Sequence, residues 1–134
     1  MFASAIYVVV DVRRQTLDAA NAGHHPLHLL RDNSASTECA TASGPPLGML
    51  GEHEYATETV TLASGDALIM FTDGATEPHN HADEEFGVAR LIDIALRQRG
   101  DPDALINEIE TAIASFTGHA PMFDDFTVVA LNAR

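Results

Sequence analysis

The sequence predicts an α+β domain in which antiparallel strands come first and two helices follow. Two observations predict this class. Runs of apolar and β-branched residues of strand length recur between residues 5 and 72, whereas apolar residues at helical spacing are confined to residues 88–116. Strands and helices segregated in this way along a chain are typical of α+β folds. The 134 residues and the 46% apolar fraction are those of one globular domain, so we expect residues 1–134 to form a single domain.

The strand signals begin near the N-terminus. Ala5–Val12 is a continuous β-branched run, as expected for a strand covered on both faces. Arg13–Gln15 would form a turn, and Thr16–Ala22 would return as the second strand of a hairpin. Four further strands are predicted at Leu27–Arg31, Tyr55–Leu62, Ala67–Thr72 and Phe126–Leu131. Turn chemistry is expected at Asp32–Ser36, and an irregular loop at Ser43–Gly48.

Two helices are predicted between the last two strands. The first has apolar residues from Val88 to Leu96 at helical spacing and would end at Gly100. Asp101 is typical of an N-cap, and Pro102 suits the first position of a second helix. An apolar stripe then marks one face of that helix, formed by Leu105, Ile106, Ile109, Ile113 and Phe116. Two such antiparallel helices can cover one face of a sheet.

The composition excludes several classes of partner. A formal charge of −13 argues against nucleic acid, because a phosphate backbone attracts a basic surface. No apolar stretch reaches the ~18 residues of a membrane span, so no membrane partner is expected. The single cysteine, Cys39, rules out an internal disulfide and fits a reducing compartment, which predicts a cytoplasmic protein.

Two acidic motifs stand where a predicted strand meets a loop. The first is Phe71-Thr72-Asp73-Gly74, and the second is Phe123-Asp124-Asp125-Phe126-Thr127. Converging carboxylates are the ligands that hard divalent cations prefer, and they are costly to bring together without one. We therefore interpret Asp73, Asp124 and Asp125 as candidate metal ligands, with ordinary turn residues as the alternative.

The histidines do not follow a zinc pattern. None has the spacing of a zinc motif, and no cysteine pair accompanies them. We expect solvated or capping roles for five histidines, namely His24, His25, His28, His79 and His81.

Five motifs in order resemble those of the metal-dependent protein phosphatases (PPM, or protein phosphatase 2C type), and in particular the bacterial SpoIIE-like branch. They are Asn21-Ala22-Gly23-His24, Gly44-Pro45-Pro46-Leu47-Gly48, Phe71-Thr72-Asp73-Gly74-Ala75-Thr76-Glu77, Glu85-Phe86-Gly87 and Asp124-Asp125-Phe126-Thr127. The resemblance extends from about Phe2 to Leu131.

The resemblance implies an α-β-β-α sandwich of antiparallel sheets flanked by helix pairs. It implies hydrolysis of phosphoserine or phosphothreonine on a protein, with two Mn²⁺ or Mg²⁺ ions. Asp73 would match the aspartate ligand of the Asp-Gly motif and Asp124 the ligand of the last motif, with Asp125 in support. Asn21 and His24 would shape a loop rather than perform chemistry. The implied partner is a phosphorylated protein such as an anti-sigma factor antagonist.

One motif of the family has no counterpart. The first metal motif, Asp-x-x-Gly-His, supplies the aspartate that bridges both ions, whereas Asp11-Val12 is followed here by Arg13-Arg14-Gln15. We therefore expect the C-terminal part of a phosphatase domain, incomplete at its N-terminal side. We also expect weak binding of a single ion at best. Uncovered sheet edges and apolar faces would favour a homodimer.

Three functional hypotheses follow. The chain is a portion of a SpoIIE-like phosphatase, inactive by itself, whose activity belongs to a longer polypeptide. Alternatively it is a pseudophosphatase that binds an anti-sigma-pathway partner without hydrolysis. The third hypothesis is an unrelated acidic metal-binding domain.

Overall fold

The computed structural model describes residues 1–31, 35–120 and 125–134, which form seven strands, two α-helices and one short 3₁₀ helix. In chain order these elements are β1 (Ala5–Asp11), β2 (Thr16–Ala22), β3 (Leu27–Leu30), β4 (Ser36–Cys39), β5 (Thr57–Thr61), β6 (Ala67–Phe71), the 3₁₀ helix η1 (Asp73–Ala75), α1 (Gly87–Gln98), α2 (Pro102–Phe116) and β7 (Val128–Asn132). The predicted α+β class is confirmed.

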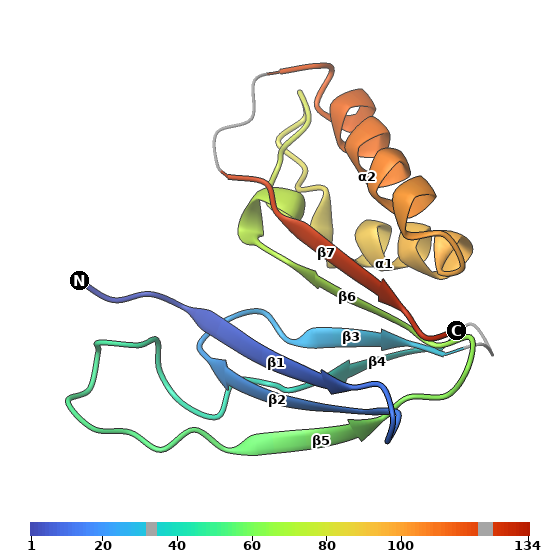
Figure 1. Ribbon diagram of the computed structural model, residues 1–134. Coiled ribbons are helices and arrows are strands. Elements are labelled where there is room, and N and C mark those ends of the chain that lie inside the picture. Colours follow the sequence, from blue (N-terminus) through green and yellow to red (C-terminus); the bar gives the residue numbers. More distant parts are fainter. Residues whose placement is uncertain (32–34, 121–124) are drawn as a thin grey trace.

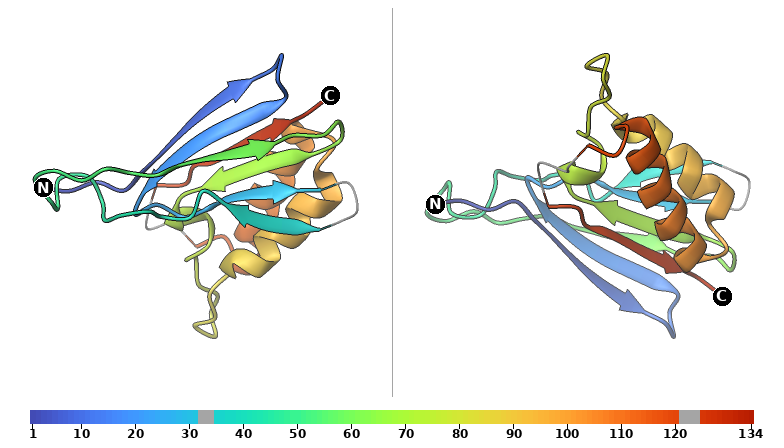
Figure 2. Two further views of the ribbon diagram at one scale, coloured as in Figure 1. Left: turned by 90° about the horizontal axis from the view of Figure 1, so that it is seen from below. Right: turned by 90° about the horizontal axis from the view of Figure 1, so that it is seen from above.

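The strands form two antiparallel sheets. One has the order β1-β2-β5 and the other the order β4-β3-β6-β7. Figures 1 and 2 show the two sheets as neighbouring layers, with α1 and α2 together on the outer face of the four-stranded sheet. Among the described residues these are the only α-helices, so this part of the chain supplies one of the two helix pairs of the expected sandwich.

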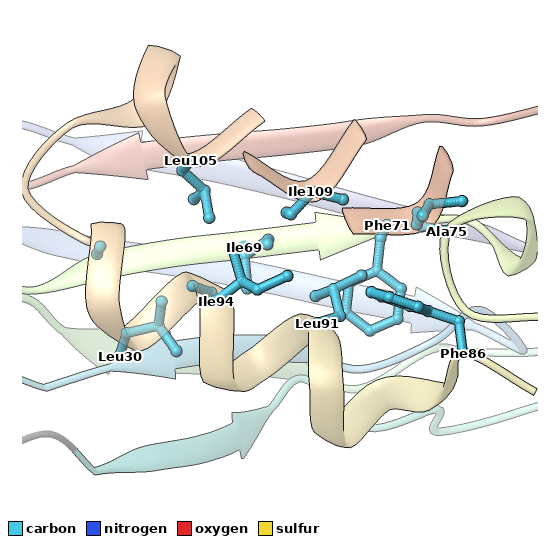
Figure 3. Packing of buried hydrophobic residues seen from close by; sticks show 12 residues of the cluster. Leu30, Ile69, Phe71, Ala75, Phe86, Leu91, Ile94, Leu105 and Ile109 are labelled. Atoms are coloured by element: carbon cyan, nitrogen blue, oxygen red, sulfur yellow. The ribbon is translucent and has the colours of Figure 1, made fainter. Parts of the chain in front are cut away.

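One core lies between the helices and the four-stranded sheet. Side chains of α1 and α2 point onto β6, where Ile69 and Phe71 meet Leu91 and Ile109 (Figure 3). All four of these side chains are almost fully buried, which stabilises the layer by roughly 1.5–3 kcal/mol for each large apolar side chain. Packing of this kind fixes the position of β6, the strand that leads into Asp73.

A second core fills the space between the two sheets. Leu17 from β2 and Val60 from β5 face Leu27 and Leu29 of β3 and Leu68 of β6. Every residue of β3 is buried, because one face of this strand packs against the three-stranded sheet and the other face packs against the helices (Figure 1). The loop that leads into β3 and the turn that follows β6 are therefore each joined to a strand with both faces covered.

The prediction that Ala5–Val12 is covered on both faces is wrong. β1 is the outermost strand of its sheet, and Tyr7 is 71% and Val9 47% exposed. The β-branched run correctly predicted a strand, but nothing among the described residues covers its free edge or its outer face. The result is an exposed apolar surface at β1, the kind of edge that proteins normally protect.

Strand β4 was not predicted, although it pairs with β3 in register from Leu27–Cys39 to Leu30–Ser36. Its residues Ser36, Thr37 and Glu38 are exposed and polar, so no alternation of apolar residues marked it. The turn expected at Asp32–Ser36 lies largely outside the described residues, and Ser36 itself begins β4.

The helical predictions are confirmed closely. The Asp101 carboxylate caps α2 by accepting a hydrogen bond from the Ala104 N–H at 3.0 Å, and Pro102 begins the helix. α1 ends at Gln98, two residues before the predicted glycine. No helix in the described parts of the chain combines the length and the apolar character needed to cross a membrane.

Candidate metal centre

A pocket of about 610 Å³ opens at the end of the four-stranded sheet where β3 begins and β6 ends. Three polar or acidic segments meet there: the loop before β3, the turn after β6 and the segment before β7. The lining residues are Ser4, Gly23, His24, His25, Pro26, Thr72, Asp73, Glu77 and Asp125.

Asp73 stands at the first position of η1, directly after the buried strand β6. Its backbone carbonyl accepts hydrogen bonds from the N–H groups of Thr76 and Glu77 at 2.9 and 2.8 Å. Its carboxylate remains 55% exposed toward the pocket. The backbone of the turn is thus fixed by the chain itself, and the charged group is left available for a ligand.

Thr72 joins this turn to the second acidic motif. Its hydroxyl donates to the Asp125 carbonyl at 3.0 Å and accepts from the Thr127 N–H at 3.0 Å. Its backbone N–H donates to the Thr127 carbonyl, also at 3.0 Å. These three hydrogen bonds continue the pairing of β6 with β7 beyond the strand ends and hold Asp125 beside the turn that carries Asp73.

Gly74 allows this close approach. A Cβ atom at residue 74 would lie 2.5 Å from the Asp125 carbonyl oxygen and 2.9 Å from its carbonyl carbon. Only a residue without a side chain fits there, because the obstacle is backbone rather than a movable side chain. The glycine of the Asp-Gly motif therefore serves the contact between the two acidic motifs.

The structure places two of the three predicted ligands in one pocket. Asp73 and Asp125 both line it. Asp124 lies outside the described residues, so its place stays a prediction.

Asn21 organises the opposite wall of the pocket. Its side chain is 1% exposed and accepts a hydrogen bond from the His24 N–H at 2.8 Å. Its amide group donates to the carbonyls of His24 and Ala40 at 3.0 and 2.8 Å, and lies 3.3 Å from the His25 carbonyl. The expectation that Asn21 shapes a loop is confirmed.

Gly23 completes that loop. Its φ of +70° is one that residues with a side chain rarely adopt, and a Cβ there would lie 2.7 Å from the Pro46 ring. The Gly44–Gly48 loop is thereby packed against the Asn21–His24 motif.

Two histidines differ from the solvated or capping roles expected of them. The His25 ring contacts the Asp73 carboxylate, with 2.5 Å between Nε2 and Oδ1. His28 is 4% exposed and stacks on the Phe71 ring, with the centroids 5.5 Å apart. Sequence reasoning missed the His25–Asp73 contact because 48 positions separate the two residues, and only the pairing of β3 with β6 brings them together.

Burial lowers the pKa of His28 below its ordinary value of 6.5, with neighbouring His25 acting in the same direction and Glu38 opposing it. The unfolded chain therefore binds a proton on this side chain at a higher pH than the folded chain does. We expect His28 to make its full contribution to the free energy of unfolding above about pH 6.5. This contribution should be lost as the pH falls through the lowered pKa of His28 in the folded chain.

Urea unfolding midpoints measured on both sides of that pH test this expectation. The matched variant is His28→Leu, which fills the buried site without a titrating group. The pH dependence attributed to His28 should be absent from the variant. If the urea midpoints of the two proteins change equally with pH, His28 is not the source of that dependence.

The chemistry of the donor set fits a divalent cation. Asp73 and Asp125 line a pocket open to solvent, and carboxylate oxygens are the donors that Mn²⁺ and Mg²⁺ take. The number of donors is small: within residues 1–31, 35–120 and 125–134, no three His, Cys, Asp or Glu side chains converge as a metal cage. The described residues therefore do not by themselves form a complete metal site.

Comparison with known proteins shows similarity over the whole chain. The family profile of Stage II sporulation protein E (SpoIIE) matches residues 1–134. The phosphoserine phosphatase RsbP of Bacillus subtilis is 34% identical over 77 residues, which is 58% of this chain and 19% of RsbP.

Two solved structures share the fold. The SiaA-PP2C domain of Pseudomonas aeruginosa superposes with a TM-score of 0.85 at 25% identity, over 98% of this chain and 52% of that one. The phosphatase domain of SpoIIE from Bacillus subtilis, in crystals presoaked with Mn, gives a TM-score of 0.65 at 18% identity, over 97% of this chain and 56% of that one.

The chain therefore spans about half of these two phosphatase-domain structures and a fifth of RsbP. The profile match over its full length, together with the pocket in which Asp73 and Asp125 meet, leads to one conclusion. The chain belongs to the SpoIIE-type branch of the PP2C (PPM) phosphatase family, the branch that regulates bacterial sigma factors.

Proposed function

We propose that this chain supplies the Asp73 side of a metal-dependent site that hydrolyses phosphoserine or phosphothreonine on a protein. The observation that supports it most is the joining of the two acidic motifs by Thr72 and Gly74, which holds Asp125 beside Asp73. Asp73, Asp125 and, by the family motif, Asp124 would hold the cation. The Mn²⁺ or Mg²⁺ ions of such a site, when bound, offset the charge of the phosphoryl group and orient the attacking water.

The chain's own residues bind and position the reactants. The Asp73 and Asp125 carboxylates concentrate negative charge in the pocket, so a phosphate group is repelled unless a cation is present. Asn21 and Gly23 fix the opposite wall, which limits the directions from which a phosphorylated side chain can enter. The proposed substrate is a phosphorylated antagonist of an anti-sigma factor.

In our proposal, hydrolysis also requires the bridging aspartate of the family's first metal motif. No segment of this sequence matches that motif. The exposed edge of β1 supports a partner segment at that side of the molecule, because Tyr7 and Val9 would be covered by additional strands. A second copy of the chain is the alternative cover and would give a homodimer.

A fusion protein tests this proposal. In the fusion, the 134-residue chain replaces the part of the SiaA-PP2C domain that it covers, which is 52% of that domain. We expect the chain alone to show no Mn²⁺-dependent hydrolysis of an aryl phosphate. We expect the fusion to show turnover that Asp73→Asn removes. Strong turnover by the chain alone, lost in Asp73→Asn, would contradict the need for a bridging aspartate.

A binding function without hydrolysis is the second candidate. It is favoured by the small number of converging donors among the residues that the structure describes. A folded fusion that binds Mn²⁺ yet hydrolyses neither an aryl phosphate nor a phosphoserine peptide would support this alternative.

A further inference from the structure

His25 offers the pocket a nitrogen donor beside the carboxylates. We propose that His25 binds the same divalent cation as Asp73, through Nε2, and that the site consequently favours transition-metal ions such as Co²⁺ and Zn²⁺ over Mg²⁺. This inference rests on the proposed function in one respect, namely that Asp73 is a metal ligand.

The hydrogen bond between the His25 ring and the Asp73 carboxylate places the two donor groups side by side in the pocket. Nε2 of His25 and Oδ1 of Asp73 are 2.5 Å apart. Two donors that each lie 2.0–2.2 Å from one ion at a right angle are separated by about 3 Å. An ion could bind between them if it replaced the proton of this hydrogen bond and the two groups moved apart by about 0.5 Å. Their side chains are 35% and 55% exposed, so this movement requires no repacking of the core.

The His25 ring contacts the sheet, and the His25 backbone is held by the loop. Its centroid lies 5.4 Å from that of Phe71, the last residue of β6. Its backbone carbonyl contacts the Nδ1 atom of His24 at 3.1 Å and the buried amide of Asn21 at 3.3 Å. The ring thus lies against the sheet and its backbone is held by the loop, so less conformational entropy is lost when an ion binds.

The chemistry of the donors predicts the selectivity. Imidazole nitrogen suits Zn²⁺ and other transition ions, whereas Mg²⁺ takes oxygen ligands and retains several waters. Loss of His25 should therefore weaken Co²⁺ binding strongly and leave Mg²⁺ binding nearly unchanged. Loss of Asp73 should weaken the binding of both ions, because an oxygen ligand serves both.

The test uses the 134-residue chain with Co²⁺ and Mg²⁺ as probes. Calorimetric titrations compare wild type with His25→Ala, with Asp73→Asn and with His79→Ala, an exposed histidine outside the pocket. We expect His25→Ala to raise the Co²⁺ dissociation constant by about tenfold or more. In the proton NMR spectrum of the Co²⁺ form, a paramagnetically shifted imidazole N–H signal should be present in wild type and His79→Ala and missing in His25→Ala.

The outcomes separate this inference from the proposed function. If Asp73→Asn weakens both ions while His25→Ala leaves the Co²⁺ affinity and spectrum unchanged, the inference is overturned and Asp73 remains a ligand. Tighter binding of both ions by His25→Ala would also overturn it, because His25 would then compete with the cation for Asp73. If Asp73→Asn leaves all binding unchanged, the proposed metal site itself fails. A second variant, His25→Asn, gives the same Co²⁺ result if His25→Ala does not fold.

Discussion

Replacement of Gly74 by alanine is expected to lower the free energy of unfolding by about 2 to 3 kcal/mol, the size of an overpacking effect at a site that cannot adjust. The added Cβ would stand 2.5 Å from the Asp125 carbonyl oxygen and 3.2 Å from the Phe126 nitrogen. Both are backbone atoms of the segment that Thr72 holds in place, so the segment has to move away. Since Asp125 moves with it, Mn²⁺ affinity should fall as well. Urea unfolding and a Mn²⁺ titration measure the two effects.

Gly100→Ala is the matched control for this substitution. No atom lies within 4 Å of a Cβ built at residue 100, which follows α1 at the surface. Its effect on stability should stay within about 0.5 kcal/mol. If Gly74→Ala and Gly100→Ala unfold at the same urea concentration and bind Mn²⁺ equally, the contact between the two acidic motifs is not as we describe it.

Asn21→Ala is expected to cost about 3 kcal/mol of the free energy of unfolding. The substitution leaves the His24 N–H and the carbonyls of His24 and Ala40 without their present partner. Each buried polar group that loses its only partner costs about 1–3 kcal/mol. The value of about 3 kcal/mol is below the sum for all three backbone groups, because some of them can bind water at the pocket wall.

The control for Asn21 is Asn107→Ala on the exposed face of α2, which should change stability by no more than about 0.5 kcal/mol. Urea unfolding at one pH compares the two variants directly. An Asn21→Ala protein as stable as Asn107→Ala would mean that this network does not hold the loop before β3.

The sequence predicted the elements whose signals are local. Asp101 and Pro102 mark the start of α2 because a cap and a fixed φ act within one turn of the helix. The burial of β1 could not be predicted in the same way. A β-branched run shows that a strand is favoured, but whether a neighbour covers it depends on segments far away in the chain. β4 could not be recognised in the sequence because its exposed residues are polar. It is a strand because it pairs with β3.

The candidate site shows the same division. Asp73 and Asp125 could be recognised because their motifs are contiguous and stand where a strand meets a loop. The need for a glycine at residue 74 could not be predicted, because it depends on the close approach of the Asp125 backbone. His25 carries no spacing signal, since it precedes β3 whereas its partner Asp73 lies in the turn after β6.

The central claim is that a divalent cation binds between Asp73 and Asp125, and paramagnetic broadening by Mn²⁺ tests it most directly. In a titration followed by amide NMR, we predict that the signals of Gly23, Gly74 and Asp125 broaden first. The signals near Gly100 should persist, because Arg99 lies beside Asn132 at the opposite end of β7. Broadening that begins elsewhere, or that is unchanged by Asp73→Asn, would contradict the claim.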